Sequence, residues 1–371
     1  MPPSPQASIG IALDEVDTPA LVLDLDALER NLLRMADAVK GSVRLRPHAK
    51  SHKCAEIARA QIAAGAVGVC CQKVSEAEAL VAGGVADVLV TNEIVGRRKT
   101  ARLARLAREA KVAVLADDAG NVADLDAAAR AEGLRLDVLV EVNVGADRCG
   151  IASGTPALAL ARSIAACRSL RFAGLHAYHG SAQHVRAPAE RRAAIAAAAE
   201  KARLTKTLIE SAGIACETVT GAGTGTFMLE SASRVYNEIQ PGSYVFMDAD
   251  YNRNVWEEGW PRFEQSLFVL ASVMSTPAPD RAVVDAGLKA SSVDSGLPQV
   301  HEWPGVEYVR ASDEHGVLKI AAGAGAPKLG EKLLLVPGHC DPTVNLYDSF
   351  VCVRRGKVEA LWPVSARGAV W

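Results

Sequence analysis

The chain has 371 residues, of which 49% are hydrophobic and 23% are charged, and its formal net charge is −2. This length suits two domains better than one, and the balanced charge, with no long run of one sign, argues against a role in binding nucleic acid or membrane surfaces. Residues 1–9 contain no apolar core of a signal peptide, and no segment approaches the roughly 20 apolar residues of a membrane-spanning helix. The eight cysteines form no CxxC pair, so we expect a cytoplasmic protein with free thiols.

The first two thirds of the chain alternate between strand and helix patterns. A strand pattern at 20–23 precedes a helix at 27–39, where Asp26 and Glu29 suit a capping box. Further strands are expected at 43–45, 67–71, 87–91, 112–116, 136–144, 170–177, 218–220 and 238–240. Helices are expected at 53–64, 74–82, 97–110, 122–131, 156–167, 188–212 and 227–233.

These strands are apolar runs without strict alternation, which is typical of strands covered on both faces. Alternating strands and helices predict a parallel sheet, and eight units indicate an α/β fold built on a closed (β/α)₈ (TIM) barrel. An open, doubly wound sheet is the alternative.

Past residue 256 the pattern changes. Short β-type runs are separated by Gly, Pro, Asp and Ser, without helical patterns, at 265–275, 281–286, 317–321, 332–336, 350–353 and 358–362. We therefore expect a barrel over 26–255 and an all-β domain formed by 1–25 and 256–371.

Polar and titratable side chains follow the predicted barrel strands. The active site of such a barrel lies at the carboxyl ends of its strands. The residues at these positions include Lys50, Gln72, Asn143, Arg148, Tyr178, His179 and His184. Their convergence on one rim predicts a functional site there.

The loop Gly221–Thr226 follows the seventh strand and opens a helix, and Gly242 and Ser243 follow the eighth strand. Freed backbone N–H groups, hydroxyls and a helix N-terminus form an anion site, and this is the common phosphate position of these barrels. The alternative is a turn that merely requires glycine. Lys50 would face this loop, where a partly buried lysine can form a Schiff base; an ordinary surface lysine is the alternative.

The C-terminal region contains His339 and Asp341, two residues apart. In an extended segment they would face the same side and share a divalent ion of the manganese or magnesium type, while Cys340 points away. A structural His–Asp pair would have the same spacing.

These motifs resemble the D-threonine aldolase and D-serine dehydratase group of fold-type III pyridoxal 5'-phosphate (PLP) enzymes, relatives of alanine racemase. The resemblance covers nearly the whole chain. It is carried by Asp17–Ala20, Arg46–Lys50, Gln72–Glu78, Gly221–Thr226, Gln240–Gly242 and His339–Leu346.

The resemblance implies roles for individual residues. Lys50 matches the cofactor lysine, Arg148 the arginine at the phenolic oxygen of the cofactor, and His179 a histidine packed on its ring. The implied phosphate ligands are Thr224, Gly225, Thr226, Gly242 and Ser243, and Gln72, Tyr178 and Tyr251 are implied neighbours of the cofactor. His339 and Asp341 match the metal pair, and His184 or a metal-bound water is the implied base.

Two departures refine the implied activity. Gln240 stands where racemases carry arginine, which disfavours simple racemisation. Asp341 stands where the dehydratases of the group carry cysteine for zinc, and a carboxylate favours magnesium or manganese.

We therefore expect metal-dependent retro-aldol cleavage of a β-hydroxy-D-amino acid, with D-threonine as the first substrate and 3-hydroxy-D-aspartate as the second. Dehydration of D-serine and a non-catalytic PLP carrier are the rival interpretations; a carrier would need no metal pair. A homodimer is expected by analogy alone.

Overall fold

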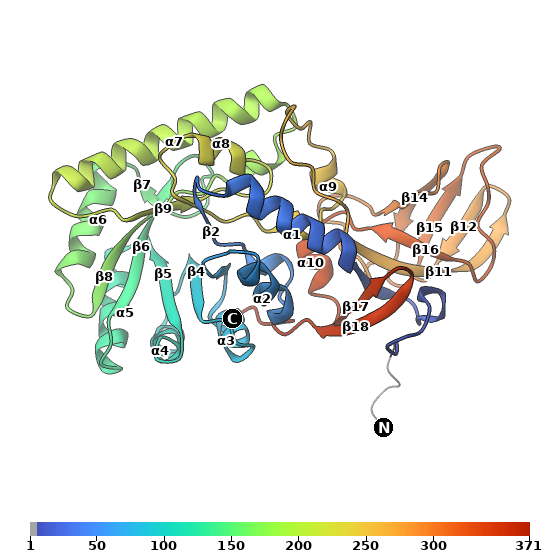
Figure 1. Ribbon diagram of the computed structural model, residues 1–371, viewed down its shortest axis with the longest axis horizontal. Coiled ribbons are helices and arrows are strands. Elements are labelled where there is room, and N and C mark those ends of the chain that lie inside the picture. The colour runs from blue at the N-terminus through green and yellow to red at the C-terminus, as the bar shows by residue number, and fades with distance from the viewer. Residues whose placement is uncertain (1–5) are drawn as a thin grey trace.

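The structure is a computed structural model that describes residues 6–371. Residues 1–5, part of the N-terminal segment in which no signal peptide is expected, lie outside the described residues. Figure 1 shows two bodies side by side, a barrel surrounded by helices and a smaller body made mostly of strands. Within residues 6–371, no helix combines the length and the apolar character needed to cross a membrane.

The larger body is a parallel β-barrel. Its strands follow the order β2 (Arg44–Leu45), β10 (Glu238–Ile239), β9 (Thr218–Gly221), β8 (Leu170–His176), β6 (Leu136–Asn143), β5 (Lys111–Ala116), β4 (Asp87–Glu93) and β3 (Val69–Cys71). The two end strands are joined as well, since Cys70 N donates to Pro47 O at 2.7 Å and Val67 N to Leu45 O at 2.9 Å. The predicted barrel is therefore confirmed and the open sheet is excluded. A two-residue strand, β7 (Ile151–Ala152), pairs with β6.

Helices cover the outside of the barrel (Figure 1). They are α2 (Ala55–Ala63), α3 (Val74–Ala82), α4 (Arg97–Leu106), α5 (Ala119–Ala131), α6 (Thr155–Ala166), α7 (Pro188–Ser211) and α8 (Phe227–Ala232). The apolar faces of α3 to α7 share one core cluster with the strands from β3 to β9, and this cluster includes Leu103, Leu125, Leu160 and Ile164. The apolar positions that recur with helical spacing in the sequence are therefore those that pack on the barrel.

Helix α1 (Leu25–Val39) precedes the barrel, and its apolar face of Leu28, Leu32, Met35 and Val39 is buried. The predicted capping box is wrong. Asp24 caps the helix, because its side chain accepts a hydrogen bond from Ala27 N at 2.9 Å.

The smaller body is a mostly antiparallel sheet. Its path runs β14 (Val306–Ala311), β15 (Gly316–Ile320), β12 (Arg281–Val284), β11 (Leu267–Ala278), β1 (Ala20–Asp24), β17 (Ser349–Arg354) and β18 (Lys357–Pro363). Two further strands, β16 (Lys332–Val336) and β13 (Gln299–Val300), pair beside β11. Strand β1 lies between β11 and β17, so the N-terminal strand belongs to this sheet.

This body also contains a helical turn that the sequence patterns did not predict. Helix α10 (Cys340–Val344) follows β16 and packs against the 3₁₀ turn Ala49–Ser51 of the barrel. A helix of five residues is too short to show a 3.6-residue period, which explains why the pattern missed it. Through α10, the second body reaches the carboxyl end of the first barrel strand.

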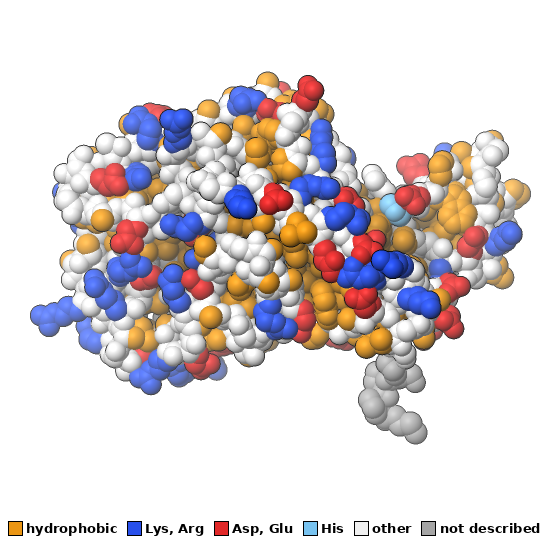
Figure 2. Space-filling view, viewed as in Figure 1, with side chains coloured by type: hydrophobic (Ala, Val, Ile, Leu, Met, Phe, Trp, Pro, Cys, Tyr) orange, Lys and Arg blue, Asp and Glu red, His pale blue; other side chains and the backbone are white. Residues whose placement is uncertain are grey.

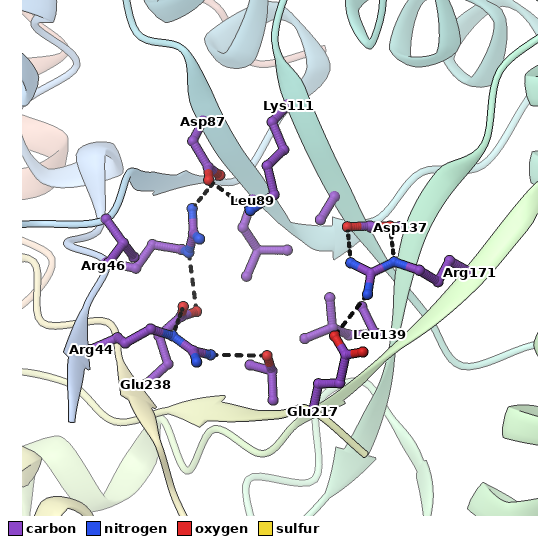
Figure 3. Close-up of a pocket in the computed structure, with 14 residues that line it drawn as sticks. Arg44, Arg46, Asp87, Leu89, Lys111, Asp137, Leu139, Arg171, Glu217 and Glu238 are labelled. Carbon is purple, nitrogen blue, oxygen red and sulfur yellow. Dashed lines mark hydrogen bonds and ion pairs between the residues drawn. The ribbon is translucent and has the colours of Figure 1, made fainter. Parts of the chain in front are cut away.

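The opposite end of the barrel is lined by charged side chains that pair with one another (Figure 3). Arg46 contacts Glu238 at 3.1 Å and Asp87 at 2.6 Å, and Lys111 also contacts Asp87 at 2.9 Å. Arg171 pairs with Asp137 and Glu217 across the same cavity. At this end of a barrel such groups support stability rather than chemistry.

The outer surface carries no patch of a single charge on the face seen in Figure 2, where acidic and basic side chains are interspersed. This mixture agrees with the near-neutral net charge of −2.

Candidate active site

The carboxyl ends of the barrel strands surround one pocket. Eight predicted site residues line it: Lys50, Gln72, Arg148, Tyr178, Thr224, Gly242, Ser243 and Tyr251. Seven further residues line it: His48, Gln240, Ala222 and Gly223 of the predicted anion loop, and Ser51, Thr91 and His176, of which the last three were not predicted. The predicted convergence of polar groups on one rim therefore exists in the folded chain.

Lys50 lies in the 3₁₀ turn directly after the first barrel strand. The side chain of His48 accepts a hydrogen bond from Lys50 N at 3.3 Å and so stabilises the turn. The ammonium of Lys50 forms an ion pair with Asp341 Oδ2 of the second body. Burial alone would lower the pKa of Lys50, but the Asp341 carboxylate outweighs it and the net shift is upward.

His48 belongs to the segment Arg46–Lys50, and its side chain lines the pocket. Its Nε2 lies 2.9 Å from the Thr91 hydroxyl and 3.0 Å from the side-chain nitrogen of Gln72. Burial lowers the pKa of His48 well below its usual value, and the nearby charge of Lys50 adds to this shift. Because Nδ1 accepts from Lys50 N, the neutral imidazole carries its proton on Nε2 and donates it to the Thr91 hydroxyl, which also accepts from the Gln72 amide at 3.2 Å.

His176, the last residue of β8, lines the pocket, whereas the predicted His179 does not. His176 Nε2 lies 3.2 Å from Gln240 Oε1, and the Gln240 amide donates to the Thr220 hydroxyl at 2.8 Å. The half-buried His179 ring lies beside Gly145, and its Nδ1 is 3.3 Å from the Ser181 hydroxyl. The two-residue period of a strand could have indicated which histidine points inward, but the pattern left the end of this strand uncertain by a residue.

The glycine loops form a cradle around the pocket. A Cβ on Gly242 would lie 2.6 Å from the Ser51 hydroxyl, so the backbone approaches that hydroxyl closely. The Ser51 hydroxyl is buried and forms no hydrogen bond within residues 6–371. Small backbone groups and an unpaired hydroxyl are what an anion site requires.

Gly225 and Thr226, which were predicted as phosphate ligands, lie behind the pocket wall. The Gly225 N–H donates to Gln183 Oε1 at 3.0 Å, and the Thr226 hydroxyl accepts from Gln183 Nε2 at 2.8 Å. Thr226 also donates to Glu230 at 2.7 Å. These groups are occupied by a buried network, so the cradle is restricted to Gly223, Thr224, Gly242 and Ser243.

His184 lies beside the pocket residue Tyr251, with ring centroids 5.3 Å apart. Its Nδ1–H donates to Asp250 Oδ2 at 2.5 Å. Burial would raise the pKa of Asp250, but Arg186 and Arg253, which both bind this carboxylate, hold it below its usual value. The charged Asp250 therefore orients the His184 ring and leaves Nε2 as the free acceptor.

His339 and Asp341 do not lie in one extended segment, so that premise is wrong. His339 is the extended N-cap of α10, and Asp341 lies in its first turn. Cys340 is fully buried, and its Sγ donates to Asp341 Oδ1 at 3.3 Å, while burial raises its pKa well above the usual value.

The proposed metal site has two protein donors, the imidazole of His339 and the carboxylate of Asp341. Within residues 6–371, no cluster of three or more His, Cys, Asp or Glu side chains could hold a metal ion. A divalent ion bound by His339 and Asp341 would complete its shell with water or substrate oxygens, as magnesium and manganese commonly do.

Comparisons with known proteins agree with this geometry. The model of the alanine racemase N-terminal domain matches residues 23–250, and the model of a putative serine dehydratase domain matches residues 266–353. These two domains define the class, which is the fold-type III PLP enzymes with an alanine racemase-like barrel.

The relatives narrow the class. The chain is 51% identical to a D-threonine aldolase of Arthrobacter sp, over 98% of this chain and 96% of that protein. It is 49% identical to a 3-hydroxy-D-aspartate aldolase of Paracoccus denitrificans, over 97% and 94%. The crystal structure of D-threonine aldolase from Filomicrobium marinum superposes with a TM-score of 0.96 at 53% identity, over 99% of both chains. The chain belongs to the D-threonine aldolase family of aldehyde-lyases.

Proposed function

We propose that this protein catalyses the PLP- and divalent-metal-dependent retro-aldol cleavage of β-hydroxy-D-amino acids, with D-threonine giving glycine and acetaldehyde. The observation that carries the proposal is the contact between Lys50 Nζ and Asp341 Oδ2. It brings the proposed cofactor lysine of the barrel and the proposed metal carboxylate of the second body together at the pocket.

The pocket suits PLP. Lys50 would hold its aldehyde carbon, and the cradle of Gly223, Thr224, Gly242 and Ser243 would hold its phosphate. When bound, PLP supplies an electron sink for the bond broken at Cα. Arg148, Tyr178, Gln72 and Tyr251 line the same pocket and would surround the ring.

His176 and Gln240 suit the wall beside that ring better than His179 does, since both line the pocket and contact each other. Gln240 is uncharged, so at this position the cofactor ring would meet a hydrogen-bonding amide instead of the arginine of a racemase.

The proposed metal ligands are His339 and Asp341, and manganese or magnesium fits their imidazole and carboxylate donors. When bound, such an ion supplies a Lewis acid that lowers the pKa of the substrate β-hydroxyl.

His184 is the proposed base. With Nδ1–H held by Asp250, its Nε2 would accept the β-hydroxyl proton. The electrons of the O–H bond then form the carbonyl at Cβ while the Cα–Cβ bond breaks, and a proton returned to Cα completes glycine. A metal-bound water is the alternative base.

Product analysis tests the proposal. Purified enzyme loaded with PLP and Mn²⁺ is incubated with D-threonine, 3-hydroxy-D-aspartate or D-serine. We expect glycine and the matching aldehyde from the first two substrates, with D-threonine preferred. Pyruvate from D-serine at a higher rate than glycine from D-threonine would replace the aldolase proposal by β-elimination.

Three further parts of the proposal concern the whole molecule. We propose a homodimer, a cytoplasmic location, and a division into a barrel over 26–255 and a β domain formed by 1–25 and 256–371. The pairing of β1 with β11 and β17 supports the assignment of the N-terminal segment to the β domain.

A further inference from the structure

A loop of the β domain, residues 291–297, lies against the proposed metal ligand His339. Asp294 in this loop accepts a hydrogen bond from His339 Nδ1 at 2.7 Å through its Oδ2. Two serines hold the same carboxylate, since Ser292 Oγ donates to Oδ1 at 2.7 Å and Ser295 Oγ to Oδ2 at 3.0 Å. The carboxylate of Asp294 is therefore fixed in one orientation toward the histidine.

The loop itself is anchored on both sides. Ser292 N donates to the Thr343 hydroxyl of α10 at 3.1 Å. On the barrel side, Arg253 donates to the Ser295 carbonyl at 2.7 Å. The same guanidinium binds Asp250, the partner of His184. The loop thus connects the segment of the proposed metal ligand with that of the proposed base.

The backbone of the loop also touches the segment before His339. A Cβ on Gly338 would lie only 1.9 Å from the Gly296 carbonyl oxygen, so only glycine permits this approach. Gly338 is therefore needed for the close approach of the 291–297 loop to the His339 ring.

We propose that Asp294 is the positioning residue of the metal site: by accepting the Nδ1–H of His339, it fixes the ring and leaves Nε2 as the ligand atom. This inference rests on the proposed metal site and adds a residue to it. Metal-binding histidines generally donate their second N–H to a carboxylate or carbonyl, and loss of that partner costs 10–100-fold in metal affinity. Asp294 faces Nδ1, so it acts through His339 and is not itself a ligand.

The test measures binding of Mn²⁺ to the PLP-loaded protein from the free-ion signal in electron paramagnetic resonance. We expect Asp294→Ala to weaken Mn²⁺ binding about 10–100-fold. Asp294→Asn should lie between Asp294→Ala and the parent, because its amide oxygen still accepts the hydrogen bond without the charge. At saturating Mn²⁺, kcat of both variants should approach that of the parent. Asp313→Ala, an exposed aspartate of the same domain, is the matched control and should bind Mn²⁺ normally.

A second variant separates the inference from the proposed function. His339→Ala should lose Mn²⁺ binding; if it retains binding, the metal site itself is wrong. If His339→Ala loses Mn²⁺ while Asp294→Ala binds it as tightly as the parent, the positioning role is overturned and the metal site stands. Loss of Mn²⁺ from Asp294→Ala as complete as in His339→Ala, with kcat not recovered by excess ion, would make Asp294 a ligand and also overturn the inference. Cofactor absorbance and thermal unfolding confirm that each variant is folded, and Asp294→Asn serves if the alanine variant is not.

Discussion

At the scale of the residue, Lys50 carries the cofactor proposal. Borohydride reduction of the PLP-loaded protein should leave the cofactor attached to Lys50, which mass spectrometry of the digested chain detects. The reason is that Lys50 is the lysine that lines the pocket opposite the glycine cradle. Lys50→Ala should bind PLP without covalent attachment, and Lys99→Ala, at an exposed lysine of the barrel, serves as the control. Cofactor fixed to another lysine in Lys50→Ala would contradict the assignment.

Glu230 offers a second test at the residue scale, through pH. Burial raises the pKa of Glu230 from its usual 4.5 to about 7, and its Oε2 has no hydrogen-bond partner within residues 6–371. The folded state therefore favours the protonated acid, and the stabilisation present below pH 4.5 is lost as the pH rises through 7.

Glu230→Gln removes this dependence on pH. At pH 8 we expect the variant to have a free energy of unfolding higher by roughly 2–3 kcal/mol than the parent, with little difference at pH 4.5. Urea unfolding at both pH values measures this difference. An equal effect at the two pH values would show that Glu230 does not titrate on unfolding in this range.

At the scale of the element, the loop that contains Gly242 is predicted to contact the PLP phosphate. Gly242→Ala places a Cβ 2.6 Å from the Ser51 hydroxyl, inside the cradle, so PLP affinity should fall at least about tenfold. Gly325→Ala, at a glycine with no atom within 4 Å, is the control. Equilibrium dialysis of the two variants makes the comparison, and equal affinity would remove the cradle from the phosphate site.

The same elements show how far sequence patterns reach. Eight apolar strands that alternate regularly with helices predict the barrel. The pattern is visible in the sequence because burial on both faces requires each strand to be apolar. Patterns did not separate His176 from His179, since the exact end of a strand depends on pairing with its neighbours. They also placed Gly225 and Thr226 in the phosphate site, because the side chain of Gln183, which occupies both residues, comes from a distant segment.

At the scale of the whole molecule, the carboxyl end of the barrel holds the proposed active site, and the ion pairs at the opposite end support stability. Arg46 is buried at the far end between Glu238 and Asp87. Arg46→Met removes the cation that Glu238 and Asp87 share, while Glu238 keeps Arg44 and Asp87 keeps Lys111. We therefore expect a smaller loss in the free energy of unfolding than the about 3–5 kcal/mol of a fully unpaired buried charge, with unchanged PLP affinity. Arg30→Met removes an exposed pair with Glu264 and should leave the free energy of unfolding nearly unchanged. A large drop in PLP affinity in Arg46→Met would show that the two ends are coupled.

The proposed active site combines both domains, because the barrel provides the proposed cofactor lysine and the β domain provides the proposed metal ligands. The most direct measurement is D-threonine cleavage by PLP-loaded enzyme before and after chelation, with the visible cofactor spectrum recorded in parallel. We predict that chelation abolishes glycine formation, leaves the spectrum largely unchanged, and is reversed by Mn²⁺ or Mg²⁺. Asp341→Ala should resemble the chelated enzyme, while Cys340→Ala, whose thiol is buried, should retain its metal. Full activity after chelation, or a Cys340→Ala variant that loses its metal while Asp341→Ala keeps it, would contradict the account.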